Sequence, residues 1–205
     1  MSAGEKLNPE PYTFEEYLAL EEKTEHKSEY HNGRIYAMLG GSFSHSIIGG
    51  NMTTALNKQI EANGKKCRAS NSDLMVYIES VNKSVYPDVA VVCDKPEFKD
   101  KNKIILLNPM LIVEVLSKST AAYDRGEKFR MYQQLPSFKE YLIVSQDQPK
   151  VECFYRESKD LWRISYAVGL DKSIHLYSMD CDIPLTEIYS FIEFEEGVQT
   201  ELDFD

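Results

Sequence analysis

The sequence has no apolar run long enough to cross a bilayer, and its first residues lack the hydrophobic segment of a signal peptide. These two absences predict a cytoplasmic protein that makes no contact with membranes. Cysteine is also scarce, and no two cysteines have the C-x-x-C spacing that is typical of zinc sites. We therefore expect neither a zinc site nor a disulfide framework, only small core residues at Cys67, Cys93, Cys153 and Cys181.

The chain has fewer basic than acidic residues, 23 against 33, which gives a net charge of −10. That balance argues against a protein with an extensive nucleic-acid-binding surface. The charges are unevenly placed, however: residues 190–205 hold six acids and no base, whereas residues 95–139 hold nine bases and five acids. We expect the lysine-rich start of this basic segment, residues 95–103, to be a solvated loop.

The chain of 205 residues, of which 42% are hydrophobic and 27% charged, fits one domain with a sizeable core. Neither an internal repeat nor a low-complexity linker interrupts it. We predict a single mixed α/β domain over residues 1–205, with its core at about 12–190 and a loose acidic tail at about 195–205.

Short local signals predict the first elements of this domain. Thr13 and Glu16 have the spacing of a capping box, so a helix should run from there to about residue 22. Asn32-Gly33 is a strong hairpin-turn signal between strands at 27–30 and 34–38. A helix should follow Ser42, because apolar residues recur every four positions from 48 to 60 before Gly64 ends the pattern.

Apolar runs and alternating patterns predict the remaining elements. Helices are expected at 124–135 and 185–194. Strands are expected at 67–69, 73–78, 85–92, 111–116 and 141–145, followed by a C-terminal meander at 151–156, 161–168 and 173–177.

Two of these strands contain a carboxylate where an apolar residue would be expected. Glu114 interrupts the run Leu111–Leu116, and Asp88 interrupts the run at 85–92. A buried, ionised carboxylate costs several kcal/mol, on the order of a domain's whole stability margin, unless it is compensated. A metal ion, a buried base, a hydrogen-bond network or a water-filled cleft would each compensate the buried charge.

The pair of acids points most directly to a metal. Two neighbouring carboxylates raise each other's pKa, and a divalent cation reverses that penalty. Hard oxygen ligands suit Mg²⁺ or Mn²⁺, which can activate water for hydrolysis of a phosphodiester bond. The helix expected after Glu114 supplies Lys128, whose side chain should lean back toward the sheet.

Several of these segments together resemble a known family. Tyr86-Pro87-Asp88-Val89 and Ile112-Val113-Glu114-Val115-Leu116-Ser117, then Asp124, Lys128 and Tyr132, resemble the Uma-type restriction endonucleases of the PD-(D/E)XK nuclease superfamily. The resemblance extends upstream to residues 28–35, which look like the family's first hairpin, and to Ser44-His45-Ser46, which look like the start of its first core helix. Glu140-Tyr141-Leu142-Ile143-Val144 matches the strand after its basic helix, so the resemblance covers roughly residues 12–190.

The resemblance implies a restriction-endonuclease-like core, in which helices flank a central four-stranded mixed sheet with an N-terminal hairpin. It implies metal ligands at Asp88 and Glu114, and further polar groups near the metal at Glu29 and His45. It also implies a DNA-cleaving enzyme, for which a homodimer would bring two active centres to two strands. The sequence departs from the superfamily pattern at Leu116, where a lysine is expected. The narrower family suggests that Lys128 has taken over that role.

Each of these residues also has a simpler interpretation. Glu114 could form a buried ion pair with Lys128 or Arg125 that holds the helix on the sheet, and Asp88 could accept backbone hydrogen bonds after Pro87. Lys128 alone could be an ordinary surface lysine.

The flanking residues have simpler interpretations as well. His45 could cap its helix, Glu29 could be an exposed strand residue, and Asp124 is expected to be the N-cap of the next helix. The corresponding alternative function is a catalytically inactive nuclease fold that binds nucleic acid or another protein. A purely structural role for the acids is a third possibility.

Overall fold

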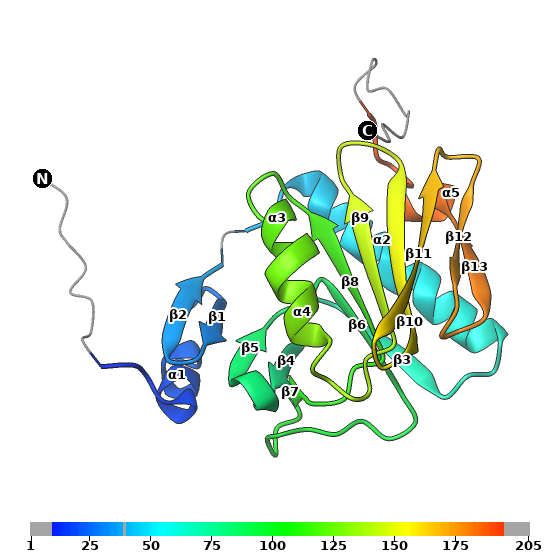
Figure 1. The fold of residues 1–205 in the computed structure, drawn as a ribbon. Coiled ribbons are helices and arrows are strands. Elements are labelled where there is room, and N and C mark those ends of the chain that lie inside the picture. Colours follow the sequence, from blue (N-terminus) through cyan, green and yellow to red (C-terminus); the bar gives the residue numbers. More distant parts are fainter. Residues whose placement is uncertain (1–9, 39, 195–205) are drawn as a thin grey trace, which may run out of the picture.

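The computed structural model describes residues 10–38 and 40–194, which form a mixed α/β structure around a six-stranded sheet (Figure 1). The strand order is β11-β10-β9-β8-β6-β3, with β8 and β9 parallel and the other pairs antiparallel. The strands are β3 (Cys67–Ser70), β6 (Val89–Cys93), β8 (Leu111–Leu116), β9 (Glu140–Ser145), β10 (Lys150–Ser158) and β11 (Leu161–Val168).

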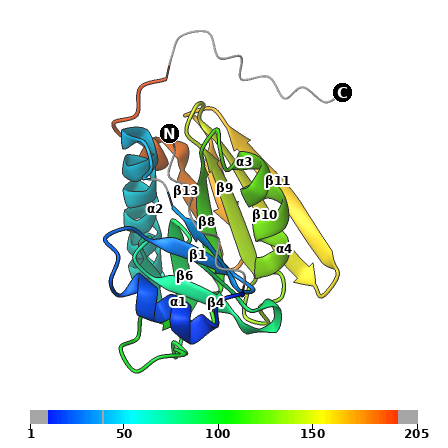
Figure 2. The same cartoon turned by 90° about the vertical axis from the view of Figure 1, so that its left-hand side faces the viewer.

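Helices cover both faces of this sheet, as Figure 2 shows with β8 and β9 between them. One face packs against α2 (Phe43–Ala62). The other packs against a continuous helical segment made of α3 (Ala121–Tyr123), the π-helix η2 (Asp124–Lys128) and α4 (Phe129–Tyr132). All six residues of β8 are buried because its alternate side chains face α2 on one side and α4 on the other.

A second, five-stranded sheet lies beside the first, in the order β2-β1-β5-β4-β7. It consists of β1 (Ser28–His31), β2 (Arg34–Ala37), β4 (Met75–Ile78), β5 (Lys83–Val85) and β7 (Ile105–Leu106), with the 3-10 turn η1 (Glu79–Val81) before β5. The capping box predicted at Thr13 begins α1 (Phe14–Glu21), which packs on this sheet through Phe14 and Tyr17. The predicted hairpin turn is confirmed, with positive φ at Asn32 and Gly33.

The C-terminal strands differ in part from a simple meander. β10 and β11 extend the central sheet, whereas β12 (Ser173–Leu176) pairs with β13 (Cys181–Pro184) in a separate hairpin. Helix α5 (Leu185–Ile188) follows, so the helix expected at 185–194 is shorter than predicted. The acidic tail predicted at about 195–205 lies outside the described residues.

The predicted fold class is confirmed, because a central mixed sheet is flanked by helices and preceded by a hairpin. The single strand expected at 85–92 is wrong: β5 belongs to one sheet and β6 to the other, and Tyr86-Pro87-Asp88 links them. Proline lacks the N–H group that a ladder requires, which explains the break. Asp88 consequently lies at the junction of the two sheets.

Two further expectations are corrected. Cys67 and Cys93 are directly opposed on β3 and β6 and form a disulfide, which their sequence separation of 26 did not reveal. Asp124 is not an N-cap, because the helical segment already begins at Ala121, after Thr120. None of the helices within residues 10–38 and 40–194 has the length and hydropathy needed to cross a membrane.

Candidate active site

Glu114 lies on β8, and Asp88 is the last residue before β6, the antiparallel neighbour of β8. The register pairs Val89 with Val113, so Asp88 and Glu114 are the residues that come next to this pair on the two chain segments. Glu114 projects toward the helical segment that carries Lys128 and Tyr132. Glu114 is only 3% exposed. Oδ2 of Asp88 also accepts a 2.7 Å hydrogen bond from the backbone N–H of Val115, which holds the carboxylate against β8.

The π-helix η2 brings the cation of the site to Glu114. Lys128 is 5% exposed, and its Nζ lies 2.9 Å from Oε1 of Glu114, 3.5 Å from Oε1 of Glu29 and 3.7 Å from Oδ1 of Asp124. The wider π-turn directs Asp124 and Lys128 into the same interior space. Lys128 is therefore not a surface lysine, and the alternative partner Arg125 is instead bound to Glu152 at 2.6 Å.

The hairpin of the second sheet closes the site from the opposite side. Glu29 on β1 is 8% exposed, so it is not an exposed strand residue. Its Oε2 lies 3.1 Å from Nε2 of His31 and accepts a 3.1 Å hydrogen bond from the hydroxyl of Tyr123. The same hydroxyl lies 3.2 Å from Nε2 of His31. Glu29 thus connects the two sheets through Lys128 and Tyr123.

His45 approaches the site from the first turn of α2. The N-cap of α2 is Ser42, whose hydroxyl accepts a hydrogen bond from the backbone N–H of His45, so the alternative interpretation of His45 as a cap is wrong. Nε2 of His45 lies 3.3 Å from Oδ2 of Asp88. The five predicted site residues therefore form two groups, one of Glu29, Lys128 and Glu114 and one of His45 and Asp88. The hydrogen bond from the Val115 N–H to Asp88 joins the two groups beside Glu114.

The sequence did not predict a role for several further residues of the site. The hydroxyl of Tyr132, one helical turn beyond Lys128, donates a 2.8 Å hydrogen bond to Oε1 of Glu114 in a fully buried position. The sequence did contain a signal for Tyr132: Asp124, Lys128 and Tyr132 are spaced i, i+4, which places them on one face of the helix that packs on the Glu114 strand. His31 and Tyr123 gave no comparable signal, since their contacts depend on how the two sheets pack.

Burial and the shared lysine set the protonation behaviour of the carboxylates. Burial raises the pKa of Glu114 well above its usual value, and the neighbouring Asp88 and Asp124 carboxylates add to the rise that Lys128 opposes. Burial likewise raises the pKa of Asp124. Burial acts to raise the pKa of Glu29 too, but the charge of Lys128 and the hydrogen bond with His31 hold it below its usual value.

On the two cationic side chains, burial has the opposite effect and acts to lower the pKa. Burial alone would lower the pKa of the Lys128 ammonium, but the three carboxylates around it raise that pKa well above the ordinary value. The hydrogen bond with Asp88 raises the pKa of His45, against the effect of burial. Lys128 is thus held in its charged form, and His45 is biased toward its charged form.

The donor chemistry of the central carboxylates fits a hard divalent cation. Hydrogen bonds within the described part of the chain use Oε1 of Glu114 and Oδ2 of Asp88, which leaves the second oxygen of each without such a bond there. No group of three His, Cys, Asp or Glu side chains within residues 10–38 and 40–194 has the arrangement of a metal site. Mg²⁺ is commonly held by one or two carboxylates together with water, so a metal site of this kind does not require a third such side chain.

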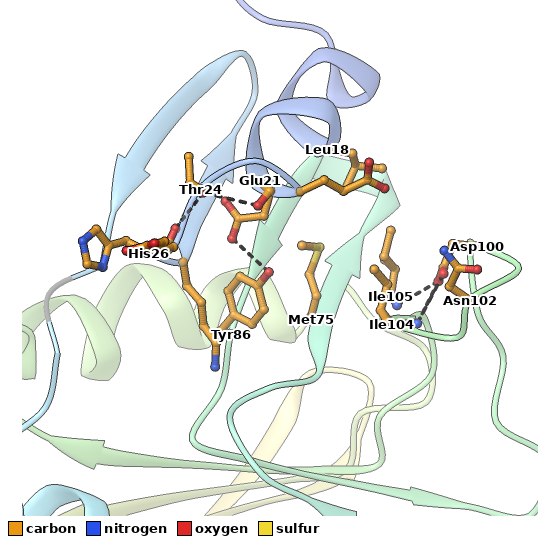
Figure 3. A pocket seen from close by; sticks show the side chains of 13 residues that line it. Leu18, Glu21, Thr24, His26, Met75, Tyr86, Asp100, Asn102, Ile104 and Ile105 are labelled. Carbon is orange, nitrogen blue, oxygen red and sulfur yellow. Dashed lines mark hydrogen bonds between the residues drawn. The ribbon is translucent and has the colours of Figure 1, made fainter.

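A hollow of about 300 Å³ lies elsewhere, between α1, β4 and the loop that contains Asp100 (Figure 3). None of the five predicted site residues lines it. Two of its acids bind neighbouring parts of the chain, and the first, Glu21, accepts hydrogen bonds from Tyr86 and Ser28. Asp100 accepts others from the backbone N–H groups of residues 104 and 105. The hollow is therefore no part of the candidate active site.

Known proteins resemble this chain in sequence and in fold. "Uncharacterized protein slr1290" of Synechocystis sp. (strain ATCC 27184 / PCC 6803 / Kazusa) is 37% identical over 189 residues, which cover 92% of this chain and 94% of that protein. "Uncharacterized protein sll1609" of the same organism is 32% identical over 167 residues, covering 82% and 93%.

A crystal structure from Anabaena variabilis ATCC 29413, described as "a putative nuclease belonging to DUF820", superposes with a TM-score of 0.70 at 19% identity, covering 89% of this chain and all of that one. This likeness shows a shared fold. The sequence model of the Uma2 family, described as "Putative restriction endonuclease", matches residues 14–177, which include all five predicted site residues. The chain therefore belongs to the Uma2 family.

Proposed function

We propose that this protein is a metal-dependent endonuclease that hydrolyses phosphodiester bonds in DNA. Asp88 and Glu114 would hold Mg²⁺ or Mn²⁺, and Lys128 would stand in for the lysine that Leu116 replaces. The observation that carries the proposal is that Asp88, just before β6, is hydrogen-bonded to the Val115 N–H next to Glu114 on β8, with Lys128 2.9 Å from Glu114. The family and the fold shared with a nuclease support the same reaction class.

Each residue has a role that follows from its contacts. Val115 and His45 hold the Asp88 carboxylate in place, and Tyr132 does the same for Glu114. The charged ammonium of Lys128 provides a fixed positive charge beside these ligands, where it can orient a water molecule or stabilise negative charge on a phosphate oxygen. A bound divalent cation would supply Lewis acidity and lower the pKa of a coordinated water.

Glu29 and His45 would act around this centre. Glu29 shares Lys128 with Glu114, so it fixes the position of the ammonium group between the two sheets. His45, whose pKa is raised, would place a partly charged imidazole at the edge of the site, where a substrate phosphate could accept its hydrogen. Cleavage of both strands would require two such centres, which favours a homodimer.

A catalytically inactive binding protein is the second candidate, and one observation favours it. Lys128 already has three carboxylates within 4 Å, as expected of a structural ion network. In that case the lysine would be fully used by internal pairs, and Leu116 would mark a lost catalytic group. Such a protein would bind nucleic acid or another protein without cleaving anything.

A plasmid-nicking assay in Mg²⁺ and in Mn²⁺ separates the two candidates. The wild-type protein should convert supercoiled plasmid to nicked or linear forms, and Asp88→Asn should not, because one ligand oxygen is lost. Asp73→Asn is a matched control, since Asp73 is an exposed acid in the turn before β4 and pairs with Lys27, away from the candidate active site. Equal cleavage by wild type and Asp88→Asn would rule out the proposed site. Cleavage by neither protein, in either metal, would favour the binding protein.

A further inference from the structure

The β1–β2 hairpin presents one of its faces to the candidate active site. Cross-strand partners project from the same face of a sheet, and the register pairs Glu29 with Tyr36 and His31 with Arg34. These four side chains therefore share one face. The alternate residue Tyr30 points the other way, into the core formed with α1.

An aromatic column on this face runs from the hairpin edge to the wall of the site. The ring of His31 lies 4.9 Å from the ring of Tyr36 and 6.0 Å, nearly parallel, from the ring of Tyr123. Glu29, the direct partner of Tyr36, lies 3.5 Å from the ammonium group of Lys128. Tyr36 is thus one cross-strand pair away from the charged centre.

Both outer residues of this face are open to solvent. Tyr36 is 47% exposed, and Arg34 is exposed without an ion pair or side-chain hydrogen bond to any residue within 10–38 and 40–194. β2 is the terminal strand of its sheet, so no further strand covers them. An exposed ring two residues from an unused guanidinium is the combination that binds single-stranded nucleic acid: the ring stacks on a base and the cation contacts the backbone.

We propose that Arg34 and Tyr36 form a subsite for an unpaired nucleotide of the substrate, next to the phosphate that is cleaved. This proposal rests on the nuclease function proposed above. Arg34 contacts a backbone phosphate on the flank of the acidic centre, and Tyr36 stacks on the base of the same segment. The base must be unpaired, because neighbouring base pairs cover both faces of a base within a duplex. The substrate therefore has an unpaired base beside the cleaved bond, as in a single strand, an overhang, a flap or a base extruded from a duplex such as a supercoiled plasmid.

The test is a binding measurement, which needs no turnover. Fluorescence anisotropy would follow a labelled single-stranded oligonucleotide, and separately its duplex, in EDTA and in Ca²⁺ at a fixed salt concentration. Tyr36→Ala should weaken single-strand binding about 5- to 150-fold, the range for loss of one stacked base. Tyr36→Phe keeps the ring and should bind within about twofold of wild type.

Matched controls come from β11, which is the terminal strand of the other sheet. Tyr166 is 46% exposed, nearly the same as Tyr36, so Tyr166→Ala should leave single-strand binding unchanged. Arg34→Gln should weaken binding and reduce the slope of log Kd against log salt concentration by about 0.7, the value for one phosphate contact on a single strand. Arg163→Gln, also on β11, should leave that slope unchanged.

Three results would overturn the subsite: Tyr36→Ala binds like wild type, Tyr166→Ala loses as much affinity as Tyr36→Ala, or the wild type binds neither oligonucleotide. Equal losses of single-strand and duplex affinity in Tyr36→Ala would also overturn it, since the ring would then not be reading an unpaired base. The plasmid-nicking assay keeps the two proposals apart. Cleavage with unchanged Tyr36→Ala binding would refute the subsite alone. The expected binding loss without cleavage by any variant would refute the nuclease and leave Arg34 and Tyr36 as a binding site of a protein that does not cleave.

Discussion

Removing the ammonium group of Lys128 should be among the most damaging single substitutions in this protein. At an effective dielectric constant of about 20, each of its contacts with Glu29, Glu114 and Asp124 is attractive by roughly 5 kcal/mol before the cost of burial is counted. That burial cost cancels most of the attraction in the intact network. Lys128→Met removes the attraction and leaves the carboxylates buried, so it should lower the free energy of unfolding by about 3–5 kcal/mol at pH 8.

The loss of unfolding free energy in Lys128→Met should become smaller as the pH falls. Burial already raises the pKa of Glu114 in the folded protein, and removal of Lys128 raises it further, so the folded state binds a proton more tightly than the unfolded chain. Protonation therefore stabilises the folded variant below that raised pKa, and this stabilisation is lost as the pH rises. The deficit of Lys128→Met relative to wild type should shrink by up to about 1.4 kcal/mol per pH unit between pH 8 and pH 5.

Urea unfolding of wild type and variant from pH 5 to pH 8 measures this deficit. Lys83→Met is the control, because Lys83 forms a 2.7 Å pair with the exposed Glu127 of the same helical segment and should cost less than about 1 kcal/mol. Glu114→Gln should cost less than Lys128→Met, since it leaves the lysine with two carboxylates. A Lys128→Met deficit below about 1 kcal/mol, or one that does not change with pH, would refute the ion network.

Three further predictions follow from contacts in and around the site. Because a metal must displace the proton that burial favours on Glu114, the Mg²⁺-induced rise in Tm should grow from pH 6 to pH 8, and a constant rise would contradict this. Tyr132→Phe should cost about 1–3 kcal/mol in urea unfolding, because the Glu114 carboxylate loses a buried donor, and a neutral effect would contradict the 2.8 Å bond. Glu140→Gln should cost a similar 1–3 kcal/mol, since that buried carboxylate accepts hydrogen bonds from Tyr177 and Ser178, and an unchanged Tm would contradict that anchoring.

The features that the sequence predicted well depend on local rules. The capping box at Thr13, the Asn32-Gly33 turn and the four-residue apolar spacing of α2 each determine structure within a few neighbouring residues. The apolar run around Glu114 indicated a buried strand, and every residue of β8 is buried. The two acids could therefore be recognised as anomalies before any tertiary contact was known.

The features that the sequence did not predict depend on how distant segments pack. Residues 85–92 look like one strand, yet Pro87 divides them between two sheets, and this division places Asp88 at the junction. Asp124 has the local properties of an N-cap but lies inside a helix that begins three residues earlier. The cross-strand pairing that joins Cys67 to Cys93 likewise depends on the register of β3 and β6.

The most direct test of the account is a calorimetric titration of Mn²⁺ into the protein. The wild type should bind Mn²⁺ at a site that Asp88→Asn and Glu114→Gln both lose, because these two side chains supply its carboxylate oxygens. Glu140→Gln, which changes a buried carboxylate outside the site, should bind Mn²⁺ like the wild type. Absence of binding in the wild type, or equal binding by Asp88→Asn, would contradict the central claim that Asp88 and Glu114 form a divalent metal site.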